Sequence, residues 1–171
     1  MDQYVASLEA ISTALGGASP DGLSLLTLPG CDLASAGVAR RHVRGTAHVW
    51  NLLEEVAEAL EAVVGELAAN ALEHTKSRSI TVTLALARQS TIIAVTDEGV
   101  DGIAAGCCPG QDSEHCRGLL IVAAVAEHWG QCHTRHGLTV WAKVGGTRLP
   151  AHATAESDRG GVGQAAVPVT S

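Results

Sequence analysis

One predicted helix places three polar side chains along an otherwise apolar stripe. The stripe consists of four aliphatic residues at spacings of four, three and four: Val56, Leu60, Val63 and Leu67. At about 100° per residue, Asn70 and His74 continue this stripe and Glu66 lies about 60° to its side. A buried polar group is costly unless it is hydrogen-bonded or coordinated. Glu66, Asn70 and His74 therefore indicate either a ligand-binding edge or a helix end that simply meets solvent.

A second group of residues surrounds the end of a predicted strand. Asp97 closes the apolar segment TIIAVTD, Gly99 follows it, and Gly118 directly precedes the next predicted helix. A carboxylate beside flexible backbone can accept a hydrogen bond from an exocyclic amine. A helix that starts after Gly118 would offer free N–H groups and a positive dipole end to a phosphate. The simpler alternative is a capped turn followed by a surface loop, and the local pattern leaves both open.

The hydropathy pattern predicts the elements that position these residues. Residues 1–20 form an N-terminal helical extension with apolar positions at Val5, Leu8, Ile11 and Leu15, 21–148 form one domain, and 149–171 form a flexible tail. The domain pattern predicts strand 23–28, helices 32–50 and 53–74, strands 80–86 and 91–97, helix 119–130 and strands 131–135 and 138–144. This order predicts an α+β fold, a two-layer α/β sandwich whose mostly antiparallel sheet is covered by helices on one face.

Composition limits the classes of function. Of the 171 residues, 46% are hydrophobic and 17% are charged, which excludes a wholly disordered chain. The formal net charge is −7, so direct binding to nucleic acid or to an anionic membrane is disfavoured. No apolar run is long enough to span a bilayer, and no basic residue precedes Arg40 to begin a secretory signal. Five cysteines, two of them adjacent, favour a reducing compartment, and we expect a cytoplasmic protein.

Four segments in order resemble the motifs of the GHKL ATPase superfamily, whose members share the Bergerat fold. GELAANALEHT resembles the N box, VTDEG the G1 box, CRGLLIV the G2 box, and HGLTVWAKV the closing strand segment. The resemblance covers residues 23–144 and includes the helix pair that precedes the N box. Among GHKL proteins, the chain is most similar to the small anti-sigma-factor serine/threonine kinases of actinobacterial regulators.

The resemblance implies a site for ATP or ADP with Mg²⁺. Asn70 would bind the cation through its carbonyl oxygen, in keeping with the preference of Mg²⁺ for oxygen ligands. Glu66 would act as the general base toward an attacking hydroxyl group. Asp97 would accept a hydrogen bond from the adenine amino group, and Gly99 and Gly118 would let backbone approach the nucleotide.

Three further residues belong to the site that the resemblance implies. Arg117 is a candidate for a phosphate contact on charge and position alone, and Leu119 would line the nucleotide site. Thr139 would lie near the hydrogen-bond network on the adenine side. The implied partner is a protein, either a sigma factor or an antagonist of an anti-sigma factor, and a homodimer is compatible with the resemblance.

Two positions depart from the family pattern and support an alternative function. Asp101 and Cys116 stand where the G1 and G2 boxes have glycine, and the segment between the boxes has no basic residue before Arg117. An acidic residue near a polyphosphate and a Cβ in a glycine loop favour nucleotide binding over efficient turnover. The leading interpretation is a kinase that phosphorylates or sequesters a protein partner in transcriptional control. The alternative is a non-catalytic nucleotide-binding module that acts by protein contact.

The cysteines and histidines raise a third, weaker interpretation, a metal or redox sensor. Seven such residues lie in or after the segment between the boxes: Cys107, Cys108, His115, Cys116, Cys132, His133 and His136. Their spacing matches no common zinc pattern, and the chain contains no C-x-x-C pair.

Overall fold

The computed structural model describes residues 2–99, 114–134 and 137–145. In chain order the elements are α1 (Asp2–Ala14), β1 (Gly22–Pro29), α2 (Ala34–Val49), α3 (Glu54–His74), β2 (Ser79–Ala87), β3 (Ser90–Asp97), α4 (Glu114–Val125), β4 (His128–Thr134) and β5 (Gly137–Gly145). The predicted tail, residues 149–171, lies outside the described residues, as does the segment that contains Asp101.

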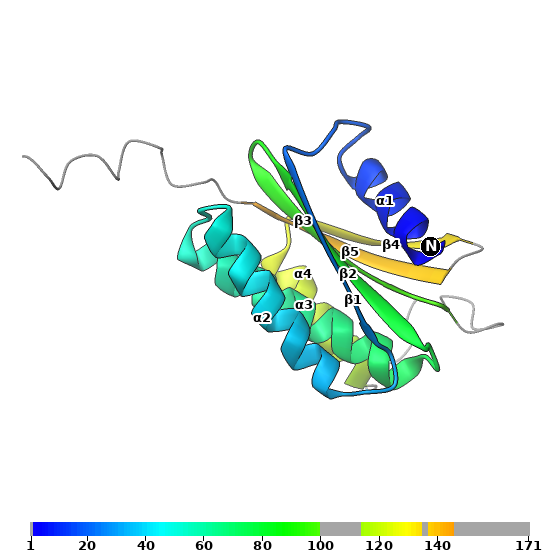
Figure 1. Cartoon of the computed structure of the whole chain (residues 1–171). Helices are drawn as coiled ribbons and strands as arrows, with labels where there is room; N and C mark the ends of the chain where they lie inside the picture. Colours follow the sequence, from blue (N-terminus) through cyan, green and yellow to red (C-terminus); the bar gives the residue numbers. More distant parts are fainter. Residues whose placement is uncertain (1, 100–113, 135–136, 146–171) are drawn as a thin grey trace, which may run out of the picture.

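The five described strands form one sheet in the order β1-β2-β3-β5-β4, and every neighbouring pair is antiparallel. Helices α2, α3 and α4 cover one face of this sheet, while α1 lies across the other face (Figure 1). The predicted α+β sandwich is confirmed. The N-terminal helix adds to it a partial layer on the face that α2, α3 and α4 leave open.

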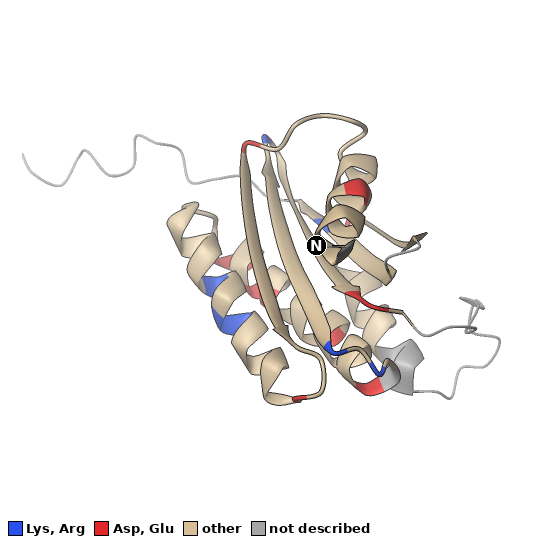
Figure 2. Ribbon diagram, turned by 45° about the vertical axis from the view of Figure 1, so that its right-hand side comes forward, with Lys and Arg blue, Asp and Glu red and all other residues tan. Residues whose placement is uncertain are grey.

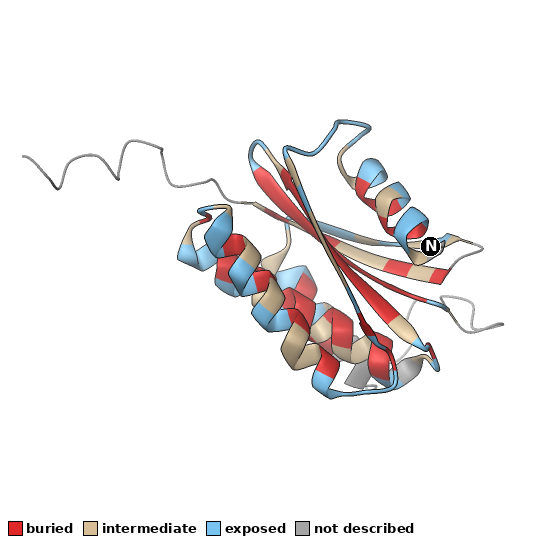
Figure 3. Cartoon of the chain, in the orientation of Figure 1, coloured by how far each residue is buried: buried red, intermediate tan, exposed pale blue. Residues whose placement is uncertain are grey.

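The main core lies between α3 and the sheet, as the two hydropathy periods predict. Side chains at every second position of β2 point toward α3: Ile80, Val82, Leu84 and Leu86. The predicted apolar stripe of α3 is buried against them, and Leu60 and Val63 are fully inaccessible to solvent. Figure 3 shows the buried residues along α3 and in the central strands. The core holds α3, which carries Glu66 and Asn70, in one orientation above the sheet.

Helix α1 packs on the sheet through small residues and hydroxyl groups. Ala6, Ala10 and Ile11 are buried, whereas Val5, a member of the predicted apolar stripe, is 40% exposed. The Oγ atom of Ser7 lies 2.7 Å from Oγ1 of Thr83 and accepts a hydrogen bond from Thr96 over 3.2 Å. The helix and the burial of Ile11 were predicted, but the contact through Ala6, Ser7 and Ala10 was not, because small side chains permit a close approach that larger apolar residues would prevent.

The boundaries of α4 and of β4, which starts at His128 rather than at residue 131, differ from their predictions, whereas the start of α2 agrees with its prediction. Helix α2 starts where expected, with the N–H of Ala34 donating to Oδ1 of Asp32 over 2.9 Å. Helix α4 begins at Glu114 rather than near residue 119, and it ends at Val125, before β4 starts at His128. Gly118 therefore lies inside a helix, although glycine is a weak helix former and the sequence pattern predicts a helix boundary there. Within the described residues, no helix combines the length and the hydropathy that a membrane crossing requires.

Candidate functional site

Helices α3 and α4 are in close contact where Gly118 faces Glu66 and Asn70. A methyl group on Gly118 would lie 2.8 Å from Oε2 of Glu66 and 3.4 Å from Nδ2 of Asn70. The two polar side chains are one turn apart on α3, so they line the same edge of that helix. Both are half-buried. The structure thus brings together Glu66, Asn70 and Gly118, which the sequence separates by about 50 residues.

The expected role of Gly118 as the residue before a helix N-terminus is wrong. Because α4 begins at Glu114, the free N–H groups of its first turn precede Gly118. The glycine instead permits close packing, because any side chain at this position would meet Glu66 and Asn70. A close helix–helix contact therefore explains the glycine better than a turn does.

Asp97 supplies a buried carboxyl group at the end of β3, on the sheet face that α3 covers. Its exposed fraction is 3%. Burial raises the pKa of Asp97 to about 6, while the hydrogen bond from Gly99 and the charge of His133 lower it and the charge of Glu98 raises it. The N–H of Gly99 donates to Oδ1 of Asp97 over 2.6 Å. A buried carboxyl group with a strongly shifted pKa is typical of a functional site.

The turn after Asp97 depends on glycine. Gly99 has φ +68°, in the left-handed region that residues with a Cβ rarely adopt. A methyl group there would also lie 3.5 Å from Cα of Gly137, at the start of β5. The backbone of the two segments therefore runs close together beside Asp97.

A chain of hydrogen bonds joins the end of α3 to the end of β3. Thr75 donates to the carbonyl oxygen of Ala71 over 2.6 Å, and its Oγ1 lies 2.8 Å from Oγ of Ser77. The N–H of Glu98 donates to the same Oγ of Ser77 over 2.9 Å. These contacts link the helix that carries Glu66 and Asn70 to the strand that carries Asp97, so the two halves of the site are held in a fixed relation.

The sequence profile of the histidine kinase-like ATPase domain family matches residues 31–144, about two thirds of the chain. The chain belongs to this family. Among solved structures, it is similar to the crystal structure of the RsbU and RsbW domains of Rv1364c from Mycobacterium tuberculosis, with a TM-score of 0.56 and 17% identity. That match covers 77% of this chain and 35% of the other, and at this identity it shows a shared fold. A comparison with curated proteins gave no match.

Members of the histidine kinase-like ATPase family bind ATP, typically with Mg²⁺. The chain contains the groups that such a ligand requires: an amide oxygen on Asn70, a buried hydrogen-bond acceptor on Asp97, and backbone without side chains at Gly99 and Gly118. Gly118 lies so close to Glu66 and Asn70 that a Cβ at this position would contact both side chains. The residues present therefore fit the nucleotide and the cation.

Thr139 lies apart from this group. Its Oγ1 is 2.8 Å from Oγ1 of Thr96, on the sheet face that α1 covers. On the face of Asp97, the cross-strand neighbour is Leu138, because β3 and β5 pair in the register Asp97–Leu138. The structure thus places Thr139 in the α1 interface, and Leu138 occupies the position beside the buried carboxyl group.

The remaining predicted residues belong to α4. Leu119 is half-buried and packs against the main core, so it supports the helix that carries Gly118. Arg117 directly precedes Gly118 in α4, but its side chain lies outside the described structure, as do the side chains of His74 and Cys116.

His133 is a neighbour of the site that the sequence did not single out for this role. The register places Asp97, Leu138 and His133 in one row across β3, β5 and β4, with their side chains on the same face. His133 is exposed, and its charge acts on the pKa of Asp97. The alternation of side chains along β4 could have indicated which face of the sheet His133 lies on. Only the strand order β3-β5-β4 brings His133 near Asp97.

The described part of the chain contains no group of three or more His, Cys, Asp or Glu side chains arranged to hold a metal ion. Cys31 is exposed and Cys132 is half-buried, and both are free thiols. Cys107, Cys108 and His136, which the sensor interpretation also requires, lie outside the described residues.

Proposed function

We propose that this protein binds ATP with Mg²⁺ and acts as an anti-sigma-factor-type serine/threonine kinase, which phosphorylates or sequesters a protein partner in transcriptional control. Residues 21–148 form the ATP-binding unit. The observation that carries the proposal is the meeting of α3 and α4, where Gly118 lies directly against Glu66 and Asn70. Family membership and the buried carboxyl group of Asp97 support it.

Each residue of the site has a role that follows from its chemistry. Asn70 would hold Mg²⁺ through Oδ1, and Asp97 would accept a hydrogen bond from the adenine amino group. Gly99 and Gly118 would allow close contact with the nucleotide, Leu119 would keep α4 in place, and Arg117 would contact phosphate. Bound ATP would supply the phosphoryl group for transfer.

Glu66 would act on the partner rather than on the cation. Its carboxylate lies one turn from Asn70 on the same helix edge, which puts it close to the metal ligand but leaves it free to accept a proton. In the proposed reaction, the carboxylate of Glu66 would take the proton of a serine or threonine hydroxyl group as the hydroxyl oxygen bonds to the γ-phosphorus of ATP and the bond from that phosphorus to ADP breaks. Such a general base typically contributes about 10²–10⁴-fold to the rate.

The partner of the proposed kinase is a sigma factor, an antagonist of an anti-sigma factor, or each of these in turn. The solved structure with the same fold contains an RsbW domain beside an RsbU domain. Mixing the purified protein with labelled ATP, Mg²⁺ and candidate antagonist proteins tests the proposal directly. Phosphate on a serine or threonine of one candidate is the expected result. No Mg²⁺-dependent ATP binding in calorimetric titration would refute the site itself.

A non-catalytic binding module is the second candidate, and two residues favour it. Asp101 and Cys116 stand where related proteins have glycine. If they slow turnover, replacing both with glycine should raise ATP hydrolysis or phosphotransfer, because glycine at position 101 removes a negative charge and glycine at position 116 removes a Cβ from the first turn of α4. If wild type transfers no phosphate to any candidate, yet ATP still changes partner affinity, the binding module is the better description.

A further inference from the structure

Strand β1 forms an edge of the sheet that lacks the usual protection. Among the described strands only β2 pairs with it, so the outer backbone groups of β1 have no strand partner. Native edge strands commonly carry charged residues, internal proline or a bulge, which discourage pairing with another chain. The eight residues GLSLLTLP contain no charge, and their proline is the last residue. This edge is therefore suited to accept a further strand.

A surface groove runs over this edge, and we name it the β1–α2 groove. Leu23 and Ser24 both line it, although adjacent side chains on a strand point to opposite faces of a sheet. The groove therefore straddles the strand edge itself rather than one face. Its apolar surface comes from Leu23, which is 41% exposed, from Val49, which is 79% exposed, and from half-buried Trp50.

The walls of the groove are held in place by contacts between β1 and α2. The indole of Trp50 packs against the start of β1, where a methyl group on Gly22 would lie 3.3 Å from its ring. Oγ of Ser24 lies 3.0 Å from Nε2 of His42 and 3.4 Å from Oγ1 of Thr46. The groove is thus preformed, which lowers the entropy loss on binding.

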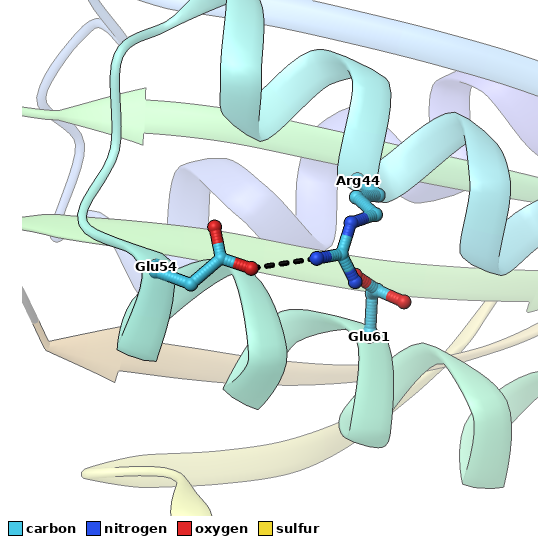
Figure 4. Close-up of polar contacts among 3 residues, drawn as sticks. All are labelled: Arg44, Glu54 and Glu61. Carbon is cyan, nitrogen blue, oxygen red and sulfur yellow. Dashed lines mark hydrogen bonds and ion pairs between the residues drawn. The ribbon is translucent and has the colours of Figure 1, made fainter.

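The charge beside the groove is positive, although the chain as a whole is negative. Helix α2 contains three arginines and two histidines and no acidic residue (Figure 2). Arg44 is neutralised by Glu54 and Glu61 of α3, at 2.6 and 2.8 Å (Figure 4). Arg41 lines the groove, is exposed, and has no ion pair to a described residue. A positive side chain therefore remains available beside the free strand edge.

We propose that the β1–α2 groove binds an extended, acidic segment of a partner protein. The segment adds to β1 as a strand, places an aspartate or glutamate against Arg41, and rests apolar side chains on Leu23, Val49 and Trp50. Strand addition supplies main-chain hydrogen bonds, and the pockets for alternate side chains supply specificity. Tryptophan and arginine are the residue types most often found at binding hot spots.

A second copy of this chain fits the groove less well than an acidic segment does. Two chains paired through β1 would bring together two α2 helices that carry only positive charges, and each chain has a net charge of −7. The groove also lies far from the proposed nucleotide site. It faces the start of β1, which pairs with the end of β2, whereas Asp97 pairs with Ile80 at the start of β2. The proposal therefore goes beyond the ATP site and does not require phosphotransfer.

A displayed library of random nine-residue peptides, selected on the full chain, tests the proposal without assuming a partner. We expect enriched peptides to carry acidic residues and to alternate apolar with polar positions. Their affinity should fall at least about tenfold in Arg41→Glu, because this variant reverses the charge that the acidic residue of the peptide would contact. It should stay within about twofold in Arg78→Glu, the matched control, which makes the same change of charge at an exposed residue before β2, at the end of that strand opposite the groove.

Two variants that replace exposed apolar residues, together with hydrogen exchange, complete the test. Val49→Ser should weaken the selected peptides several-fold, whereas Leu33→Ser, at a residue that is 68% exposed but outside the groove, should not. A bound peptide should slow amide exchange in residues 22–29. Enriched peptides without an acidic excess, equal binding to Arg41→Glu, or no protection of β1 would each overturn the proposal. So would concentration-dependent dimerisation that protects β1 in the absence of peptide, because a second copy would then be the occupant.

Discussion

Gly118 of α4 faces Glu66 of α3 so closely that a methyl group on the glycine would lie 2.8 Å from Oε2 of the carboxylate. The atom that would be displaced is the far end of a flexible side chain, so the protein could accommodate the methyl group by turning Glu66 away. The fold would tolerate that movement, but the proposed catalysis by Glu66 would be impaired, because the position of its carboxylate relative to the bound nucleotide would change.

Gly118→Ala should therefore separate stability from activity. Alanine in a helix interior is favoured over glycine by about 1 kcal/mol, which offsets the local crowding. We expect a melting temperature near that of wild type together with phosphotransfer reduced at least about tenfold. Gly45→Ala is the matched control, because α2 has open space at that position. If Gly118→Ala phosphorylates its partner as fast as Gly45→Ala does, the activity of Glu66 does not depend on the absence of a side chain at position 118.

Glu66→Gln distinguishes the kinase from the binding module. The amide keeps the size of the side chain but cannot take a proton, so we expect phosphotransfer to fall by about two orders of magnitude or more. ATP affinity should stay within a few-fold, since a general base contributes little to ground-state binding. Glu73→Gln, an exposed position on the same helix, should change neither quantity. Radiolabel incorporation and calorimetric titration on the same preparations provide the comparison, and equal rates in the two variants would remove Glu66 from the mechanism.

Asn70→Ala and Asp97→Asn should weaken ATP binding for different reasons. The first variant loses the metal ligand, so we expect its affinity to fall at least about tenfold in Mg²⁺ and to depend little on Mg²⁺ thereafter. The second should lose adenine recognition while its affinity still responds to Mg²⁺. Titration of ATP and of an inosine nucleotide, with and without Mg²⁺, measures both effects. Wild-type affinity in both variants under every condition would contradict the assigned site.

Asp97→Asn should also change the pH dependence of stability. The folded pKa of about 6 is above the ordinary value of 3.8, so the folded state binds more protons between these values and wild type loses stability as the pH rises through that window. The full penalty, about 3 kcal/mol, is present above pH 7 and absent below pH 4. The variant avoids it, so its advantage in free energy of unfolding should grow from pH 4.5 to pH 8. Urea denaturation across this range measures the difference, and a constant difference would show that burial does not raise this pKa.

Ser7→Ala tests whether α1 is part of the folded unit. The hydroxyl group is fully buried between Thr83 and Thr96, so its removal leaves a buried hydroxyl of Thr83 without this partner. We expect a loss of about 1–3 kcal/mol in the free energy of unfolding. Ser12→Ala, on the exposed side of the same helix, should lose less than about 0.5 kcal/mol. Equal losses in the two variants would mean that α1 does not stay on the sheet in solution.

The sequence by itself was sufficient to predict the helices and strands that a local hydropathy pattern defines. The alternation of apolar residues predicted β2, and the helical period of the apolar stripe predicted α3, because each face must be buried against a neighbouring layer. Glu66 and Asn70 fall on one edge of α3 for the same local reason, since residues four apart in a helix are neighbours. The position of Asp97 at a strand end was also predictable from the change of pattern after residue 97.

Only the tertiary structure decided which of these residues meet. Gly118 faces Glu66 because α4 begins at Glu114 and packs on α3, and a glycine inside a helix cannot be told from a glycine before one without its neighbours. Leu138 rather than Thr139 lies beside Asp97 because the register of β3 and β5 assigns alternate residues to opposite faces. The buried face of α1 and the free edge of β1 follow from the strand order. Each of these depends on contacts between residues far apart in the chain, which local propensity and period do not encode.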